Sequence, residues 1–216
     1  MSTYDLEEQE QIDALKAWWK QYGTLIVTVV VAGALGVAGV FGWRGYQASQ
    51  AAQASAIYSE LRQAAGARDV KKVRDLAGAI LEQYPRSVYA PLAAFISAKA
   101  HFESGELKTA RAQLEWVVDH ASDPEYQAIA RLRLANVLID EKDYSGALKV
   151  LDAKPDPSFE ARFAGARGDI YAQEGKPGEA RAAYLSALEK TPLGDTVARQ
   201  LLQLKLDALG ETPRGG

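Results

Sequence analysis

Residues 21–43 form a stretch of 23 residues without a single charged side chain. A helix rises about 1.5 Å per residue, so this stretch is roughly 34 Å long, enough to cross the ~30 Å hydrocarbon core of a bilayer. Aromatic side chains gather at its two ends: Trp18, Trp19 and Tyr22 at the first, and Trp43 and Tyr46 at the second. Such rings are typical of both membrane interfaces. We therefore predict one transmembrane helix over residues 21–43.

A cleaved signal peptide is the alternative to a membrane helix. Its apolar core would be 7 to 15 residues long and would follow a basic start. Here the apolar run is longer and residues 1–20 are acidic. The small-x-small sequence of residues 52–54 lies about ten residues beyond the run, too far for a cleavage site of this type. The sequence favours a retained span.

Small residues recur every four positions within the span, at Ala34, Ala38 and Gly42. This spacing places them on one helix face, where a second membrane helix could approach closely. Glycine and alanine are also simply common in membrane spans. We predict a helix-packing face, and ordinary span composition remains the alternative.

The charge of the chain is concentrated before the span. Of 28 acidic and 25 basic residues, residues 1–20 hold five acidic and two basic, and the remainder is balanced at 23 of each sign. A balanced domain lacks the basic patch that nucleic acid or acidic lipid headgroups require. The chain has no cysteine, which excludes disulfides and thiolate chemistry. Lys16 and Lys20 before the span and Arg44 after it favour a cytoplasmic N-terminus only slightly.

Beyond the span the sequence predicts helices throughout, because it is rich in Ala, Leu, Gln, Glu, Lys and Arg. Residues 44–56 should continue the membrane helix as a helical connector.

Three later stretches align, each with a small residue, an alanine twelve positions on, and a large apolar residue four positions further. The sets are Ala98, Ala110 and Leu114; Ala135, Ala147 and Leu151; and Gly168, Ala180 and Tyr184. Small residues let the two arms of a helix hairpin cross closely.

Turn residues separate the arms at Gly105, at Lys142 with Asp143, and at Gly175, and the repeats are offset by 37 and 33 residues. The pattern resembles the tetratricopeptide repeat, whose period is 34. We predict an all-α fold in which residues 57–216 form a right-handed helical solenoid, with residues 195–209 as the C-terminal capping helix. Residues 55–85 match the repeat pattern less well. We predict that they form a first helix pair with its turn at residues 66–69.

Two departures from the repeat pattern are visible. The tryptophan expected early in each first helix is replaced by Ala94, Arg131 and Ala164. Pro155 and Pro157 should cut the second helix of the middle repeat short. Asp123 followed by proline reads as a helix N-cap.

Catalytic constellations are missing from the sequence. His101 and His120 fall in different helices without metal-ligand spacing, and His101 stands where the repeat places a packed residue. The acidic side chains at residues 140–143 are predicted to be solvent-exposed charges in a hairpin turn. We expect no enzymatic activity, no cofactor, no metal and no small-molecule substrate.

A binding surface is therefore the expected functional site. In tetratricopeptide repeats the first helices line the concave face, and the resemblance places seven residues there: Phe95, Lys99, Phe102, Leu132, Asn136, Ile139 and Asp169. This mixture suits a helical or extended protein segment. The alternative is that Phe95, Leu132 and Ile139 belong to the packing between helices.

The order of segments resembles the YfgM family, the ancillary subunits of the bacterial SecYEG translocon. The similarity rests on the acidic tail, ALKAWWKQYG running into the span, GWRGYQ leaving it, and the repeats. It implies an inner-membrane protein with residues 1–20 in the cytoplasm and the repeat domain in the periplasm. It also implies a non-catalytic chaperone or adaptor that helps newly exported proteins beside the translocon, with a membrane-anchored periplasmic chaperone of the prolyl isomerase type. A scaffold of another envelope complex is the alternative.

Overall fold

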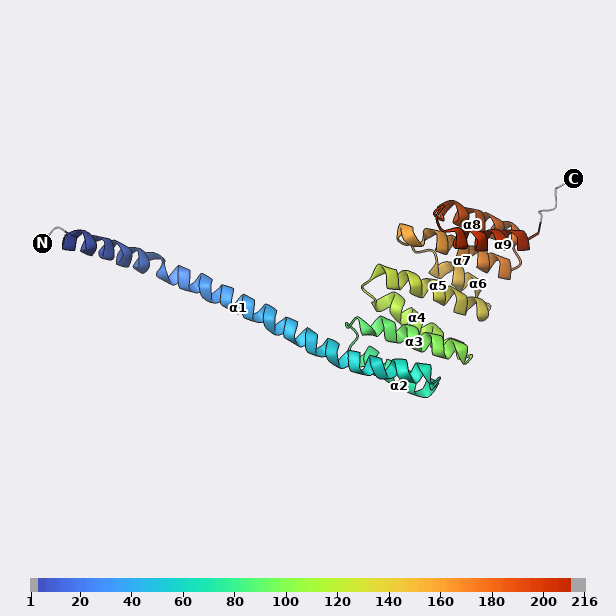
Figure 1. Cartoon of the computed structure of the whole chain (residues 1–216), viewed down its shortest axis with the longest axis horizontal. Helices are drawn as coiled ribbons and strands as arrows, with labels where there is room; N and C mark the ends of the chain where they lie inside the picture. The colour runs from blue at the N-terminus through green and yellow to red at the C-terminus, as the bar shows by residue number, and fades with distance from the viewer. Residues whose placement is uncertain (1–3, 211–216) are drawn as a thin grey trace. The chain divides into compact units, whose positions relative to one another are not determined.

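The computed structural model describes residues 4–210, which are helical apart from turns and short connections. The helices run in the order α1 (Tyr4–Gly66), α2 (Val70–Gln83), α3 (Tyr89–Glu103), α4 (Leu107–His120), α5 (Pro124–Asp140), α6 (Tyr144–Val150), α7 (Glu160–Gln173), α8 (Pro177–Lys190) and α9 (Thr196–Ala208), with a 3₁₀ turn at Pro157–Phe159 (Figure 1). No strand occurs within residues 4–210, so the predicted all-α fold is confirmed. Two compact units divide the chain, Met1–Ala52 and Gln53–Gly216.

The first unit consists of the longer part of α1. Its apolar side chains are exposed, including Leu25, Leu35 and Phe41, each more than 60% accessible. The apolar stretch of this helix is not buried against any other described part of the protein. By length and composition α1 can cross a membrane. The helix continues through residues 44–56 without interruption, as the high helix propensity of alanine and glutamine predicts.

The second unit begins with the end of α1, which pairs with α2. Leu61 and Ala64 of α1 pack with Val73, Ala77 and Ile80 of α2 in one apolar cluster. A short turn connects the two helices, and α2 begins directly after it. At the start of α2 the Asp69 carboxylate accepts a hydrogen bond from the Lys72 amide at 3.0 Å. This cap satisfies one of the free amides at the helix start.

Three helix hairpins follow, α3 with α4, α5 with α6 and α7 with α8, and they stack in sequence order (Figure 1). The backbone turns at the same point of each hairpin through a residue with positive φ: Gly105 at 79°, Lys142 at 62° and Gly175 at 79°. Two of these positions use glycine, which adopts this conformation without steric cost. The turns lie where the sequence predicts them.

The arms of the third hairpin cross at Gly168. A Cβ atom built on Gly168 would lie 2.4 Å from the ring of Tyr184 in α8, far inside van der Waals contact. Tyr184 fills the space that glycine leaves and is 3% exposed. The matching residues of the other hairpins, Ala98 and Ala135, are also buried. The predicted close crossing at a small residue is confirmed for the third hairpin.

The second helix of the middle hairpin, α6, has only seven residues. It ends at Val150, before the prolines of the following connection, as predicted. Its last carbonyl groups accept hydrogen bonds from arginines of the neighbouring first helices: Arg131 to Val150 at 3.3 Å, and Arg167 to Leu151 at 2.5 Å. These bonds satisfy carbonyls that a longer helix would have paired internally.

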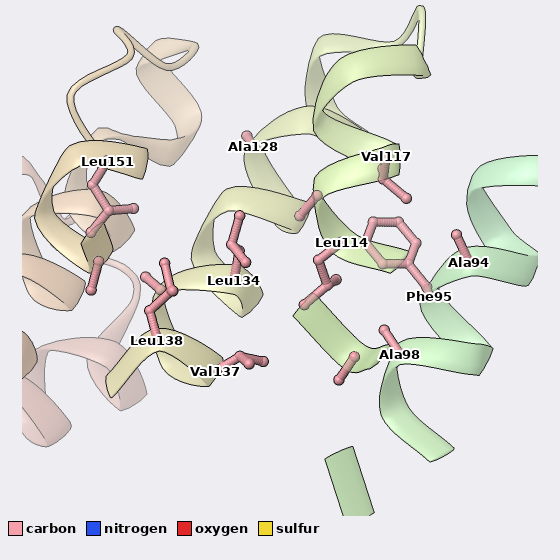
Figure 2. Packing of buried hydrophobic residues seen from close by; sticks show 14 of the residues in the cluster. Ala94, Phe95, Ala98, Leu114, Val117, Ala128, Leu134, Val137, Leu138 and Leu151 are labelled. Atoms are coloured by element: carbon pink, nitrogen blue, oxygen red, sulfur yellow. The ribbon is translucent and has the colours of Figure 1, made fainter. Parts of the chain in front are cut away.

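The buried core runs through the stacked hairpins as a chain of clusters. Figure 2 shows the central one, in which Phe95 of α3 points toward Leu114 and Val117 of α4. Leu134 and Leu138 of α5 continue it toward α6. A solenoid of this kind has no single centre, since each hairpin buries its apolar face against its neighbours.

Candidate partner-binding groove

A pocket of about 230 Å³ opens between α3, α4 and α5. It is lined by Phe95, Ala98, Lys99, Phe102, Leu114, Arg133, Asn136 and Val137. Pockets that enclose a whole drug-sized ligand are about 300–1,000 Å³. The smaller volume fits one large side chain of a protein partner.

A second hollow of about 410 Å³ lies beside the first and shares Phe102 and Asn136 with it. Its remaining lining comes from α5, α7 and α8: Ile139, Asp140, Asp169, Ala172, Gln173 and Tyr184. The two hollows together are called the groove below. It extends along the first helices of the three hairpins, which is the face that the repeat pattern predicts for binding.

Phe95 forms the floor of the groove. Its side chain is 7% exposed, and its ring packs edge-on against Tyr126 with centroids 6.2 Å apart. The guanidinium carbon of Arg133 lies 4.7 Å from the same ring, within the range of a cation–π interaction. Phe95 therefore also belongs to the interior packing, where it supports the pocket rather than projecting from it.

Phe102 provides the accessible apolar surface of the groove, because its side chain is 38% exposed and it lines both hollows. Lys99 lies one turn earlier on α3, and its side chain is 73% exposed. Its nearest acid is Glu103 at 3.7 Å, a distance typical of weak surface pairs. Together with Arg133 it makes this end of the groove cationic around an apolar centre.

Asp169 lies at the other end and is already paired. Lys205 of α9 approaches both of its carboxylate oxygens, at 2.6 and 2.8 Å, and the Tyr184 hydroxyl donates to it at 2.8 Å. Burial and the neighbouring carboxylate raise the pKa of the Tyr184 phenol, so the hydroxyl remains a donor at neutral pH. Asp169 thus lines the groove and at the same time joins α7, α8 and the capping helix.

Leu132 differs from the other six residues expected in the groove. It lines neither hollow and instead packs, partly buried, against the central core cluster. Ile139 packs against the same cluster but also lines the second hollow. For Leu132 the alternative of interior packing therefore describes its environment.

Arg133 is the basic groove residue that the sequence analysis did not predict. It stands three positions before Asn136, and residues three apart share a helix face. This spacing was the available signal. Its effect is to add a second cation beside Lys99 at the apolar pocket.

Several titratable groups outside the predicted groove set serve local structure. His101 is fully buried, as predicted, with Nδ1 3.1 Å from Glu106 Oε2. In the next hairpin turn Asp143 caps α6 by accepting from the Gly146 amide at 2.9 Å, and Glu141 pairs with Arg111 at 3.2 Å. Within the described part of the chain no three His, Asp or Glu side chains are grouped closely enough to hold a metal ion.

Comparison with known families agrees with this fold. The family described as tetratricopeptide repeat-like domain matches residues 16–211, so the protein is of the tetratricopeptide repeat class. Curated relatives extend over nearly the whole chain. A protein of Neisseria gonorrhoeae is 33% identical over 205 residues, which are 94% of this chain and 98% of that protein. One of Haemophilus influenzae is 32% identical over 210 residues, covering 95% and 99% of the two chains.

A third relative, from Escherichia coli, is 27% identical over 211 residues, covering 97% of this chain and 99% of its own length. All three carry the name "Ancillary SecYEG translocon subunit". The chain belongs to this family of ancillary translocon subunits, as the resemblance to the YfgM proteins predicts.

Proposed function

We propose that this protein is a single-pass inner-membrane subunit that associates with the SecYEG translocon and binds protein segments in the groove of its repeat domain. The support for the association is the full-length similarity to the named translocon subunits. The support for anchoring is the exposed apolar stretch of α1. The repeat domain acts by binding, as a chaperone or adaptor for newly exported proteins.

The groove carries the binding proposal. It combines a half-exposed aromatic side chain, Phe102, with an apolar pocket over Phe95 and with exposed polar groups at Lys99 and Asn136. An exported chain that is still unfolded presents apolar side chains in extended or helical segments, and the pocket is large enough for one of them. Aromatic residues, Phe among them, are enriched in the cores of protein–protein interfaces.

The topology follows from the proposed role. The N-terminal tail lies in the cytoplasm, α1 spans the inner membrane and the repeat domain extends into the periplasm, where exported chains emerge. A membrane-anchored periplasmic chaperone of the prolyl isomerase type is the proposed second partner, since the YfgM resemblance implies it.

Site-directed crosslinking in native membranes tests the groove. The chain has no cysteine, so Phe102→Cys provides a single attachment point for a photo-reactive label. We expect the label to crosslink to exported chains while they cross the translocon. Lys149→Cys, at an exposed position on α6 outside the groove, is the matched control and should give little product.

Equal crosslinking from positions 102 and 149 would contradict a binding groove. A parallel purification in mild detergent tests the translocon association itself. Recovery of a different envelope complex, without translocon subunits, would instead favour a structural scaffold of that complex.

A further inference from the structure

The α3 end of the groove brings two positive charges to one apolar pocket. The pocket walls are apolar side chains from three helices, each at most 7% exposed: Phe95, Ala98, Leu114 and Val137 (Figure 2). Lys99 and Arg133 line the same pocket, and both are exposed to solvent. Among the described residues that line this pocket, none is acidic. The pocket therefore carries positive charge that its own lining does not balance.

Arg133 differs from several other arginines of the repeat domain because it lacks an acceptor. Arg74 and Arg111 pair with glutamates, and Arg167 donates to a backbone carbonyl. Arg133 instead lies over the Phe95 ring, and its N–H groups meet no acceptor in the part of the chain that the structure describes. The contact with the ring holds the guanidinium at the pocket and leaves its five N–H donors for a ligand.

Lys99 adds a second cation that is only weakly engaged. Its side chain is 73% exposed, and its partner Glu103, 3.7 Å away, has a side chain that is 61% exposed. Exposed pairs of this kind are weak, so a carboxylate from a bound segment can replace Glu103 at little cost. The exposed amide of Asn136, on the same pocket, can both donate to and accept from the peptide groups of such a segment.

The second hollow has the opposite charge. Asp140 and Asp169 line it, and its described lining includes no basic residue. Lys205 pairs with Asp169 at 2.6 Å, whereas Asp140 is exposed and forms no ion pair with any described residue. A carboxylate on a bound segment is therefore attracted to the α3 end of the groove and repelled from the Asp140 end.

We propose that the groove selects protein segments in which a large apolar side chain stands next to a glutamate or aspartate. The apolar side chain enters the pocket over Phe95, and the neighbouring side-chain carboxylate binds Arg133 and Lys99. The planar fork of an arginine matches the two oxygens of a carboxylate. This inference rests on the proposed function of the groove and specifies which exported segments the groove retains.

Peptide binding to the full-length chain in nanodiscs of zwitterionic lipid tests this preference. The peptides are capped at both ends, so that no terminal charge remains, and share a background of glycine and serine. In the first, leucines are flanked by glutamate; in the second, by glutamine; in the third, alanine replaces leucine and the glutamates stay. Fluorescence anisotropy of a neutral label measures each Kd.

We expect the first peptide to bind about three- to tenfold more tightly than the second, because each exposed ion pair contributes modestly. The difference should shrink as added salt screens the charges. The third peptide should bind most weakly, since it has no side chain that fills the pocket.

Substitutions of Arg133 separate charge from packing. Arg133→Gln should reduce the preference for glutamate to less than about twofold, whereas Arg133→Lys, which keeps the charge, should retain most of it. Arg162→Gln is the matched control. Arg162 is also exposed and lies over a phenylalanine ring, 5.3 Å from the centroid of Phe159, but it lines neither hollow. This variant should keep the full preference.

The outcomes distinguish this inference from the function on which it rests. Equal binding of the glutamate and glutamine peptides overturns the inference and leaves segment binding in the groove intact. A preference that survives in Arg133→Gln, or that Arg162→Gln also removes, overturns it as well. Equal binding of the alanine and leucine peptides does the same, because charge alone would then explain the affinity. Absence of binding by all three peptides overturns the proposed groove function together with the inference.

Discussion

Gly168 is the residue at which the third hairpin depends most closely on side-chain size. Replacing it with alanine places a Cβ 2.4 Å from the Tyr184 ring, so ring or backbone must move. We expect Gly168→Ala to lower the free energy of unfolding by about 1–3 kcal/mol, as overpacking does. Chemical denaturation of the full-length chain in nanodiscs measures this.

Gly78 of α2 provides the matched control. It is also helical, but a Cβ there has open space within 4 Å. Gly78→Ala should raise the free energy of unfolding by about 0.4–1 kcal/mol, because alanine reduces the entropy of the unfolded chain. Equal effects of the two substitutions would show that the hairpin arms do not cross as described.

His101 makes stability depend on pH. Burial lowers its pKa below the ordinary 6.5; Glu106 opposes this shift and Arg74, which bonds Glu106 at 2.6 Å, adds to it. Its Nε2 atom is buried without a hydrogen-bond partner among the described residues, so protonation adds an unsatisfied donor. The unfolded chain then takes up a proton near pH 6.5 while the folded chain does not. The contribution of His101 to the free energy of unfolding should be fully present above pH 6.5. It should be lost as the pH falls toward the folded-state pKa.

Melting temperatures of the parent and of His101→Gln between pH 7.5 and pH 5 test this dependence. The variant should be less stable at neutral pH, since it loses a buried ring, yet its melting temperature should vary less over that range. Identical slopes for the two proteins would assign the pH dependence to other groups.

At the scale of the element, α1 carries the predicted helix-packing face. Ala34, Ala38 and Gly42 are exposed on this helix, and a Cβ at Gly42 would meet nothing within 4 Å. Isoleucine at positions 38 and 42 therefore fits the helix itself, and insertion should persist because the segment stays apolar. Any loss of membrane partners must come from separated helix backbones. We expect copurification of membrane partners to decrease.

The control exchanges Val30 and Val37 for leucine, which leaves the small residues in place and should change little. If the isoleucine variant retains all its partners, the small residues are ordinary span composition and α1 serves only as an anchor. The repeat domain would then carry the partner affinity.

At the scale of the whole molecule, the orientation in the membrane is testable with the cysteine-free chain. Glu8→Cys and the exposed Glu125→Cys place one thiol on each side of the span. In intact spheroplasts an impermeant maleimide should label position 125 and spare position 8. The reverse pattern would place the repeat domain in the cytoplasm and remove the proposed role with exported proteins.

Sequence periodicity was enough to predict the helix hairpins, their turns and the small residues at which the arms cross. Those features depend on neighbours within about 35 residues, and local rules describe them: Gly105 and Gly175 occupy positive-φ turns, and prolines end α6 early. The uncharged run of residues 21–43 likewise predicted a membrane helix, because bilayer thickness is a length that one segment must match alone.

Only the tertiary structure determined which residues of a helix face are accessible to a binding partner. Phe95 and Phe102 lie seven residues apart on α3, yet packing against α5 buries the first and leaves the second 38% exposed. The pairing of Asp169 with Lys205 joins residues 36 positions apart, in α7 and α9. The exposure of a side chain depends on which neighbouring helices pack against it. The periodicity of a single helix does not contain that information.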